Sequence, residues 1–257
     1  MQPIYIDRTS PLHALHPLTK IVGAGLLLVA TYTLPWQLAP LVIFGLVLAM
    51  AIVAGVARSL LRSLVIILLP IVFSLFLIQG ILFPPTKTLP IALGPATLWL
   101  DGLIFGFLVS TRLLALASIV LIVIQTTHPA DLVFALTERG LPNSIGYILL
   151  VSLQLVPDMS ARASAILEAQ RSRGLETRGL LRRARALPAL VGPLVVGALA
   201  DVEERAMALE SRAYNRIGPK TSLRQLIDTR RQRVARWVML LLIIALIAWR
   251  IARAFQF

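Results

Sequence analysis

Residues 21–57 form a run of 37 positions without a single charged side chain. As one helix this run would be about 55 Å long, far more than the roughly 30 Å hydrocarbon core of a bilayer. Pro35 and Pro40 lie inside the run, and proline in a helix interior breaks or kinks the helix. The run therefore predicts two membrane-spanning helices joined by a tight turn, at about 18–34 and 38–56.

Three further apolar segments are long enough to cross a bilayer. They are predicted at about 63–84, 102–126 and 235–257. Because 58% of the residues are hydrophobic and only 14% are charged, the chain lacks the charged surface of a soluble domain of this size. The sequence therefore predicts an all-α integral membrane protein with about five transmembrane helices.

The segment between the fourth and last spans has a different composition. Residues 127–236 hold 17 of the 25 Lys and Arg residues and 10 of the 12 acidic residues. The positive-inside rule places this segment in the cytoplasm, together with the N-terminus and a predicted loop at Arg58 and Arg62. The predicted organisation is an N-terminal transmembrane region (1–126), a cytoplasmic region (127–234) and a C-terminal transmembrane helix (235–257).

Two long helices are predicted within the cytoplasmic region, at about 144–173 and 180–212. The first would be about 45 Å long, with a kink at Pro157. An alternative is that the apolar stretch 186–200 forms a sixth span, although it carries glycine and proline.

The same small-Arg-small element closes both predicted helices, as Ser172-Arg173-Gly174 and as Ser211-Arg212-Ala213. A cation is favoured at a helix C-terminus by the macrodipole, and small neighbours let a partner surface approach closely. The guanidinium group also suits bidentate pairing with a carboxylate. We therefore expect these two elements, the first and second arginine tips, to contact another protein. The alternative is that each arginine is solvated and serves only the helix dipole.

Small side chains also form ridges along the two helices, and such ridges let helices cross at short distance. The predicted crossing residues are Ala161, Ala165, Ala169, Ala198 and Ala206. Two helices that cross in this way and point their tips outward would form a lever with two ends.

Arg112 lies inside the fourth span, where a charged side chain is costly. We expect it to brace neighbouring helices through Gln125, Gln79 or backbone carbonyls, with a contact to substrate as the alternative. The basic stretches 177–185 and 230–236 are expected to contact anionic lipid headgroups.

No residue pattern indicates catalysis. The histidines His13, His16 and His128 lack metal-ligand spacing with carboxylates, and the chain contains no cysteine. None of the three lysines follows a phosphate-binding glycine loop, so an energy source would have to be a partner protein. The net charge is +13, but the basic residues are not interleaved with aromatic residues as they are on a nucleic-acid-binding surface. We therefore do not expect nucleic acid as a partner. We expect no catalytic residue, metal or cofactor here, and we expect His13 and His16 to cap or pack the entry to the first span.

Four stretches resemble one protein family, the transmembrane coupling (T) components of energy-coupling factor (ECF) importers. They are "SPLHALHPLTK" at 10–20, "TTHP" at 126–129 after the span that contains Arg112, "LVPDM" with "AQRSRG" within 155–174, and "AMALESRAY" at 206–214. The resemblance covers most of the chain. Two departures fall in the last stretch, which is one residue longer than the family pattern and has Ala213 where the family has glycine.

The resemblance implies a non-catalytic subunit that binds two ABC ATPase subunits and a membrane-embedded, substrate-binding S-component. Each arginine tip would insert into a groove of one ATPase, and the crossed helices would transmit ATP-driven motion to the S-component. The implied cargo is a vitamin or a transition metal such as cobalt or nickel. The implied location is the cell membrane of a bacterium or archaeon.

Two alternatives remain open at this point. The spacing from Glu168-Ala169 to Gly174 partly matches the coupling loop of ordinary ABC importer permeases, which would also bind an ABC ATPase. The other alternative is a small polytopic membrane enzyme.

Overall fold

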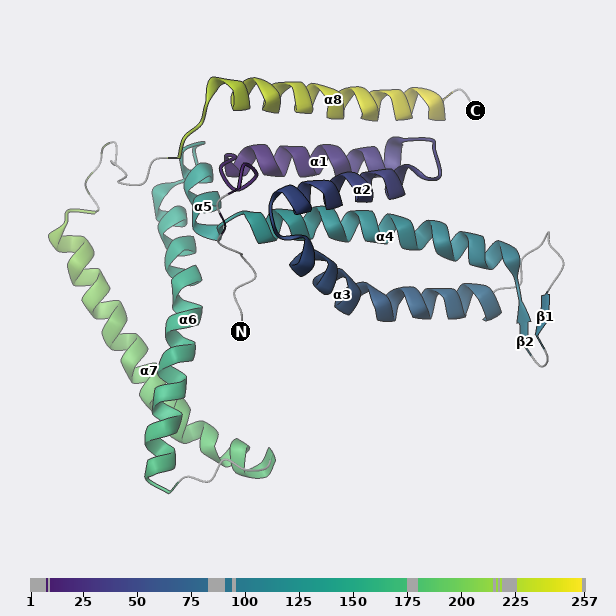
Figure 1. Ribbon diagram of the computed structural model, residues 1–257. Coiled ribbons are helices and arrows are strands. Elements are labelled where there is room, and N and C mark those ends of the chain that lie inside the picture. Colours follow the sequence, from purple (N-terminus) through teal and green to yellow (C-terminus); the bar gives the residue numbers. More distant parts are fainter. Residues whose placement is uncertain are drawn as a thin grey trace. The chain divides into compact units, whose positions relative to one another are not determined.

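The computed structural model describes residues 8, 10–82, 91–93, 96–174, 180–214, 216, 218 and 226–255. The chain forms two compact units. The first unit comprises residues 1–135 and 226–257, and the second comprises residues 136–225. Figure 1 labels the elements of both units.

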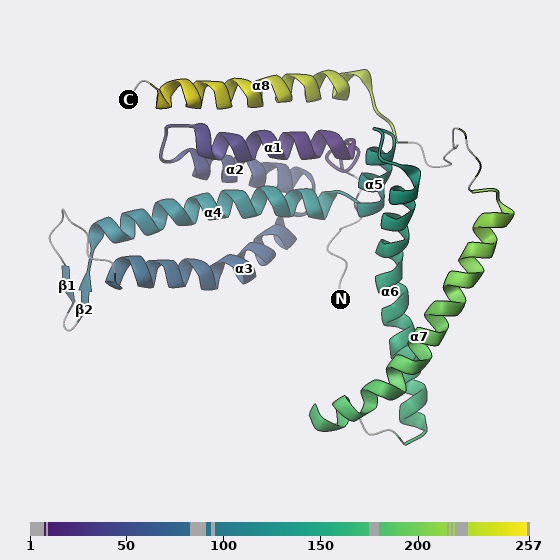
Figure 2. The same cartoon turned by 180° about the vertical axis from the view of Figure 1, so that it is seen from behind.

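The first unit is built from helices around α4. Its elements are α1 (Pro17–Thr33), α2 (Ala39–Val53), α3 (Ala57–Leu77), the π-helical turn η1 (Ile78–Leu82), α4 (Leu100–Thr126), the start of α5 (Pro129–Thr137) and α8 (Arg230–Ala254). Helix α4 packs against α1, α2 and α3, while α8 lies along α1 (Figures 1 and 2). The all-α prediction is confirmed, apart from a short antiparallel hairpin of β1 (Ile91–Leu93) and β2 (Ala96–Leu98) before α4.

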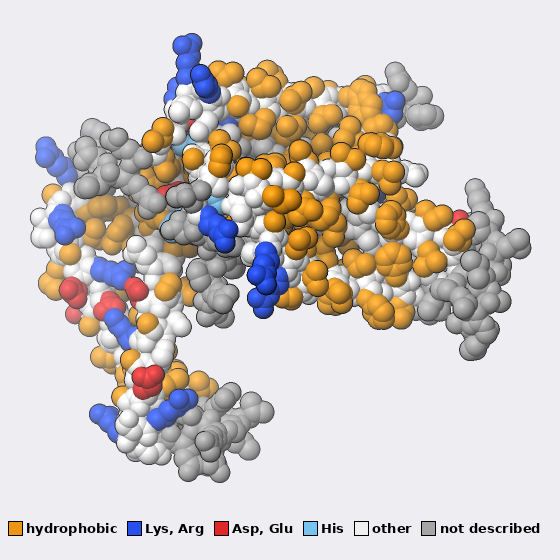
Figure 3. Space-filling model, in the orientation of Figure 1, with side chains coloured by type: hydrophobic (Ala, Val, Ile, Leu, Met, Phe, Trp, Pro, Cys, Tyr) orange, Lys and Arg blue, Asp and Glu red, His pale blue; other side chains and the backbone are white. Residues whose placement is uncertain are grey.

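The core of this unit is formed by apolar residues at helical spacing on the facing sides of three helices. These buried residues are Ile43, Val47 and Ala51 of α2, Leu60, Leu64 and Leu68 of α3, and Ala115, Ile119 and Ile122 of α4. The outward sides are apolar as well, and Figure 3 shows hydrophobic side chains over the visible face of these helices. An apolar exterior of this extent matches a lipid environment rather than water.

One glycine lets α4 approach η1 closely. A Cβ atom at Gly102 would collide with the backbone carbonyl of Gln79, and one at Gly106 would lie 3.4 Å from a methyl of Leu75. The absence of a side chain at Gly102 therefore permits the close approach of α4 to η1, whereas Gly106 has room for a Cβ in ordinary contact.

Four helical segments are long and apolar enough to cross a membrane, by length and composition. They are Ala57–Gly80, Leu100–Thr126, Asn143–Ser172 and Arg230–Arg253. Helices α1 and α2 are shorter apolar helices of 17 and 15 residues, at the positions predicted for the first two spans. The segment Asn143–Ser172, which the sequence places in the cytoplasm, has a lower mean hydropathy than the other three, 1.3 against 2.1 to 2.6.

One predicted loop is wrong. Arg58 and Arg62 lie in the first two turns of α3, which begins at Ala57. Arginine is a good helix former, and its long side chain can extend from a helix end toward water. The charged residues therefore belong to the end of this helix and do not interrupt it.

The second unit contains α6 (Asn143–Ser172) and α7 (Leu180–Ser211). Both agree within one residue with the predicted helices. Each remains a single helix through its prolines, Pro157 in α6 and Pro188 and Pro193 in α7. The two helices contact each other and cross, as Figure 1 shows.

Candidate partner-binding sites

The first arginine tip is a capped helix end. Arg173 is the C-cap residue of α6, with φ −89° and ψ 11°, and the N–H of Gly174 donates to the carbonyl of Arg171 at 3.0 Å. Gly174 has a φ of +90°, in the left-handed region that glycine adopts without steric cost. The chain therefore turns sharply away from the helix directly after the arginine.

The second arginine tip has the same plan, with an alanine in the glycine position. The N–H of Ala213 donates to the carbonyl of Glu210, and that of Tyr214 donates to the carbonyl of Leu209, both at 2.9 Å. This pair of bonds defines the Schellman motif. Ala213 has a φ of +51° and is the one residue other than glycine with a positive φ in the described part of the chain. Alanine at this position thus keeps the left-handed turn that the family pattern assigns to glycine.

All six tip residues are exposed: Ser172, Arg173, Gly174, Ser211, Arg212 and Ala213. The serine hydroxyls donate back to their own helices, Ser172 to the carbonyl of Glu168 at 3.1 Å and Ser211 to that of Ala208 at 3.0 Å. Neither guanidinium forms an ion pair with a described residue of this chain. Two arginines are therefore each followed by a residue with a left-handed backbone, and their charged groups are open to a partner.

Exchanging alanine and glycine at the left-handed position should change the stability of the chain in opposite directions at the two tips. Ala213→Gly is expected to stabilise the chain by about 1 kcal/mol, because glycine removes the strain of a left-handed alanine. Gly174→Ala is expected to destabilise it by a similar amount. Thermal unfolding in detergent, followed by circular dichroism, measures both. Gly192→Ala is the control, because that glycine is inside α7 with open space around it and no positive φ. Destabilisation by Ala213→Gly would contradict the left-handed assignment.

The second tip is fixed beside the beginning of α6. The Tyr214 hydroxyl donates to the carbonyl of Asn143 at 3.2 Å, and the rings of Tyr214 and Tyr147 lie 5.4 Å apart between centroids. The first tip is at the other end of α6, 30 residues later. The two arginine tips therefore lie roughly 45 Å apart, about the length of that helix.

The helices do not cross on the predicted alanine ridge. Ala161, Ala165, Ala169 and Ala206 are exposed, and Ala198 is partly buried. The contact lies on the adjacent face of α6, where Arg162 forms a salt bridge of 2.9 Å with Asp201 of α7. Gly197 makes room for this arginine, since a Cβ there would lie 2.9 Å from the guanidinium. A charged pair lies at the crossing, and the pattern of small residues does not reveal it.

Arg112 is not the predicted brace. It lies in α4 and is exposed, on a different side from the buried residues Thr111, Ala115 and Ser118. Within the described part of the chain no salt bridge or side-chain hydrogen bond of Arg112 is present. Gln125, a predicted partner, is buried inside the first unit instead.

A polar junction in the first unit joins two of the stretches that carry the family resemblance. Lys20 donates to the carbonyl of Thr126, the last residue of α4, at 2.7 Å. A cation at this position satisfies a carbonyl that has no partner within its own helix. The side chain of His16 caps α1 by accepting the N–H of Leu18 at 3.3 Å, as predicted for the entry to this helix.

The start of α8 completes the polar junction. The backbone N–H of His16 donates to the side-chain carbonyl of Gln232 at 3.0 Å. Arg236 is buried, and it donates to Thr19 at 3.2 Å and to Asp228 at 2.6 Å. The sequence shows only a basic run at 230–236, so the headgroup interpretation is wrong for Arg236. The side chains of 177–185, the other basic stretch, lie outside the described residues.

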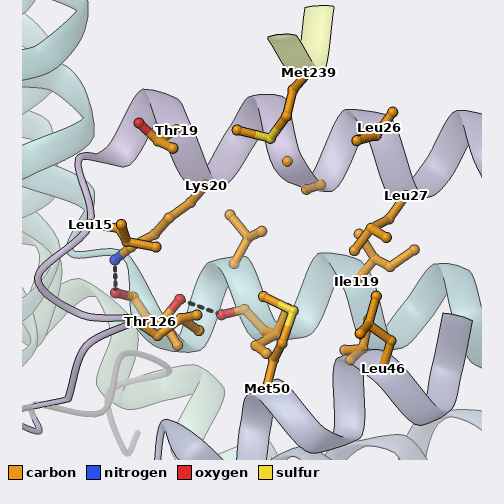
Figure 4. Close-up of a pocket in the computed structure, with 16 residues that line it drawn as sticks. Leu15, Thr19, Lys20, Leu26, Leu27, Leu46, Met50, Ile119, Thr126 and Met239 are labelled. Atoms are coloured by element: carbon orange, nitrogen blue, oxygen red, sulfur yellow. Dashed lines mark hydrogen bonds between the residues drawn. The ribbon is translucent and has the colours of Figure 1, made fainter. Parts of the chain in front are cut away.

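An apolar cavity of about 260 Å³ lies beside the polar junction, between α1, α2 and α4, with Met239 of α8 at its edge (Figure 4). Leucine, valine, isoleucine and methionine side chains form most of its lining, and Lys20 and Thr126 close one end. The lining contains no carboxylate or imidazole, so it offers no ligand set for a metal ion.

Comparisons with known proteins agree with this architecture. The family of the cobalt transport protein CbiQ matches residues 8–223. The energy-coupling factor transporter transmembrane protein EcfT of Heliobacterium modesticaldum is 31% identical over 235 residues, which cover 87% of each chain. The corresponding protein of Brevibacillus brevis is 29% identical over 265 residues and 96% of each chain. A protein of Bifidobacterium longum named as an ABC transporter ATP-binding protein is 27% identical over 258 residues, covering 93% of this chain and 32% of its own.

The family match covers most of the chain, and the helical architecture with its apolar exterior is that of a multi-pass membrane protein. The chain therefore belongs to the CbiQ/EcfT family and is a transmembrane component of an energy-coupling factor transporter.

Proposed function

We propose that this protein is the coupling subunit that joins two ABC ATPases to a substrate-binding S-component. The observation that carries the proposal is the matched pair of arginine tips. Each presents an exposed guanidinium at a helix end, without an ion pair to a described residue and followed by a residue with a left-handed backbone. Two equal contact points on one chain suit two copies of one partner, and guanidinium groups suit carboxylates in a protein groove.

The relative from Bifidobacterium longum supports an ATPase as this partner. The stretch that is similar to the present chain makes up about a third of that relative, which is named as an ATP-binding protein. A coupling segment and an ATP-binding segment joined in one polypeptide must act in the same assembly. In the present system the ATPase would be a separate subunit.

In this proposal the tips and the region 127–234 lie in the cytoplasm, and the apolar helices of the first unit lie in the cell membrane of a bacterium or archaeon. The chain is non-catalytic, since ATP is hydrolysed by the partners. Closure of the ATPases moves the two arginine tips, and the crossed pair of α6 and α7 passes the motion to the S-component. The S-component selects the cargo, a vitamin or a transition metal.

The proposal is tested by co-purification of the tagged chain with the ATPase pair of the same organism. After solubilisation in mild detergent, native mass spectrometry is expected to show two ATPase subunits for each copy of this chain. When the S-component is co-expressed, one copy is expected to join the complex. A chain that purifies without ATPases would refute the proposed function.

A further inference from the structure

Arg112 occupies the middle of a membrane-spanning helix and faces outward. It lies 12 residues after Leu100 and 14 before Thr126, the two ends of α4. These separations correspond to about 18 and 21 Å along the helix. An arginine side chain cannot cover either distance, so its charge cannot reach the headgroup region by extending along the span.

Among the described residues of the first unit, no carboxylate lies at this depth. The first unit contains four acidic residues, and three of them are described. Asp101 is in the first turn of α4, Asp131 follows the end of α4, and Asp228 precedes α8. The fourth, Asp7, lies near the N-terminus, outside the described residues. In the proposed function the mid-helix acids of α6 and α7 lie in the cytoplasm, so a pairing acid for Arg112 at mid-span has to come from another molecule.

The surroundings of Arg112 make an unpaired state in lipid unfavourable. The exposed residues nearest to it on this side of α4 include Phe105, one helical repeat of seven residues earlier. A charged side chain among apolar groups at the centre of a bilayer is strongly disfavoured unless a counter-charge or polar partner covers it. A guanidinium and a carboxylate that meet there form two parallel hydrogen bonds and exclude lipid from both charges.

We propose that the Arg112 side of α4 is a docking surface for a second integral membrane protein that presents an aspartate or glutamate at mid-bilayer depth. Cytoplasmic ATPases cannot reach this depth. In the proposed function a second copy of this chain is excluded as the acid donor, because the described acids of its first unit lie at or beyond helix ends and Asp158, in the middle of α6, lies in the cytoplasmic region. The inference rests on the proposed function, in which the remaining membrane subunit is the S-component.

The first experiment measures S-component retention by complexes of this chain with its ATPase pair. Arg112→Met is expected to lower the affinity for the S-component about thirtyfold or more, the usual effect of removing one member of a buried charge pair. Retention of the ATPases is expected to stay unchanged. Arg62→Met is the matched control, because it removes an exposed arginine close to the end of a helix. Neutralising an acidic residue that the S-component presents at mid-bilayer depth should cause the same loss, with no further loss when both changes are combined.

A second measurement needs no partner. Melting of the full chain alone in lipid nanodiscs is expected to shift to higher temperature in Arg112→Met, because an uncompensated charge is removed. A lower melting temperature would show that Arg112 is paired within its own chain and would overturn the inference.

The outcomes distinguish a failure of the docking surface from a failure of the proposed function. Wild type that holds both partners, with Arg112→Met holding the S-component equally well, would overturn the docking surface alone. Wild type that holds no S-component and no ATPase would overturn the proposed function.

Discussion

Replacing Arg173 and Arg212 together by alanine is expected to abolish retention of the ATPase pair and leave the membrane protein folded. Both side chains are exposed and pair with no described residue, so their loss removes nothing from the isolated fold. In the complex each guanidinium would be buried against a carboxylate, and truncating one member of such a pair costs about 2–5 kcal/mol. Each single variant should therefore weaken the complex, and the double variant should lose it.

Arg171→Ala is the control for this experiment. It removes an exposed arginine from the same last turn of α6, two residues before the tip, and so changes the net charge and the helix-end electrostatics similarly. ATPases are expected to remain bound to this variant. Equal retention by the double variant and by wild type would reduce the two arginines to ordinary helix ends that serve only the macrodipole.

Replacing Asp228 by asparagine is expected to be the most destabilising of the single changes in the isolated chain. Arg236, only 5% exposed, would keep its charge and lose the carboxylate that lies 2.6 Å away. Leaving a buried charge without its partner costs about 3–5 kcal/mol, and the value here should be near the lower end because Asp228 keeps some contact with solvent. The melting temperature of the chain in detergent measures the loss. Arg233→Ala is the control, because that side chain is 60% exposed and 3.8 Å from the same carboxylate.

The same residue predicts a pH dependence. The hydrogen bond from Arg236 lowers the pKa of Asp228, and the positive charges of Arg236, His16 and Arg233 add to the effect. A carboxyl group whose pKa is lowered by folding stabilises the protein at pH above its ordinary value, and this stability is lost as the pH falls through the folded pKa. The difference in melting temperature between wild type and Asp228→Asn should therefore be full at pH 7 and shrink below about pH 4. A difference that stays constant down to pH 3 would contradict the ion pair.

The sequence predicts the helices and the two tips well, because their determinants are local. Uncharged runs, prolines and the small-Arg-small elements all act within a few residues along the chain. The left-handed turn at Ala213 is a different case. Its side chain disfavours such a backbone, and the capping bonds from Glu210 and Leu209 that compensate for this are visible only in three dimensions.

The errors of sequence reasoning share a cause, which is contacts between residues far apart in the chain. Arg162 and Asp201 join α6 and α7 where they cross, although the alanine ridges suggest another face. Arg236 belongs to a buried pair and not to the lipid surface, because Thr19 and Asp228 converge on it. For Arg112 the expected brace to Gln125, Gln79 or backbone carbonyls fails because its side chain is exposed, while Gln125 is buried elsewhere along α4.

The contact of Tyr214 with Asn143 and Tyr147 has a mechanical consequence. Two of the described contacts join α6 to the segment of α7 and the second tip. They are the salt bridge near the crossing and the tyrosine contact at the second tip. A scissor motion about the salt bridge, which would change the distance between the arginine tips, has to break the tyrosine contact first. One hydrogen bond and one aromatic pair together hold about 1–3 kcal/mol, well above thermal energy but small compared with what ATP binding can supply. The contact would then hold α6 and α7 at one crossing angle until movement of both ATPases breaks it.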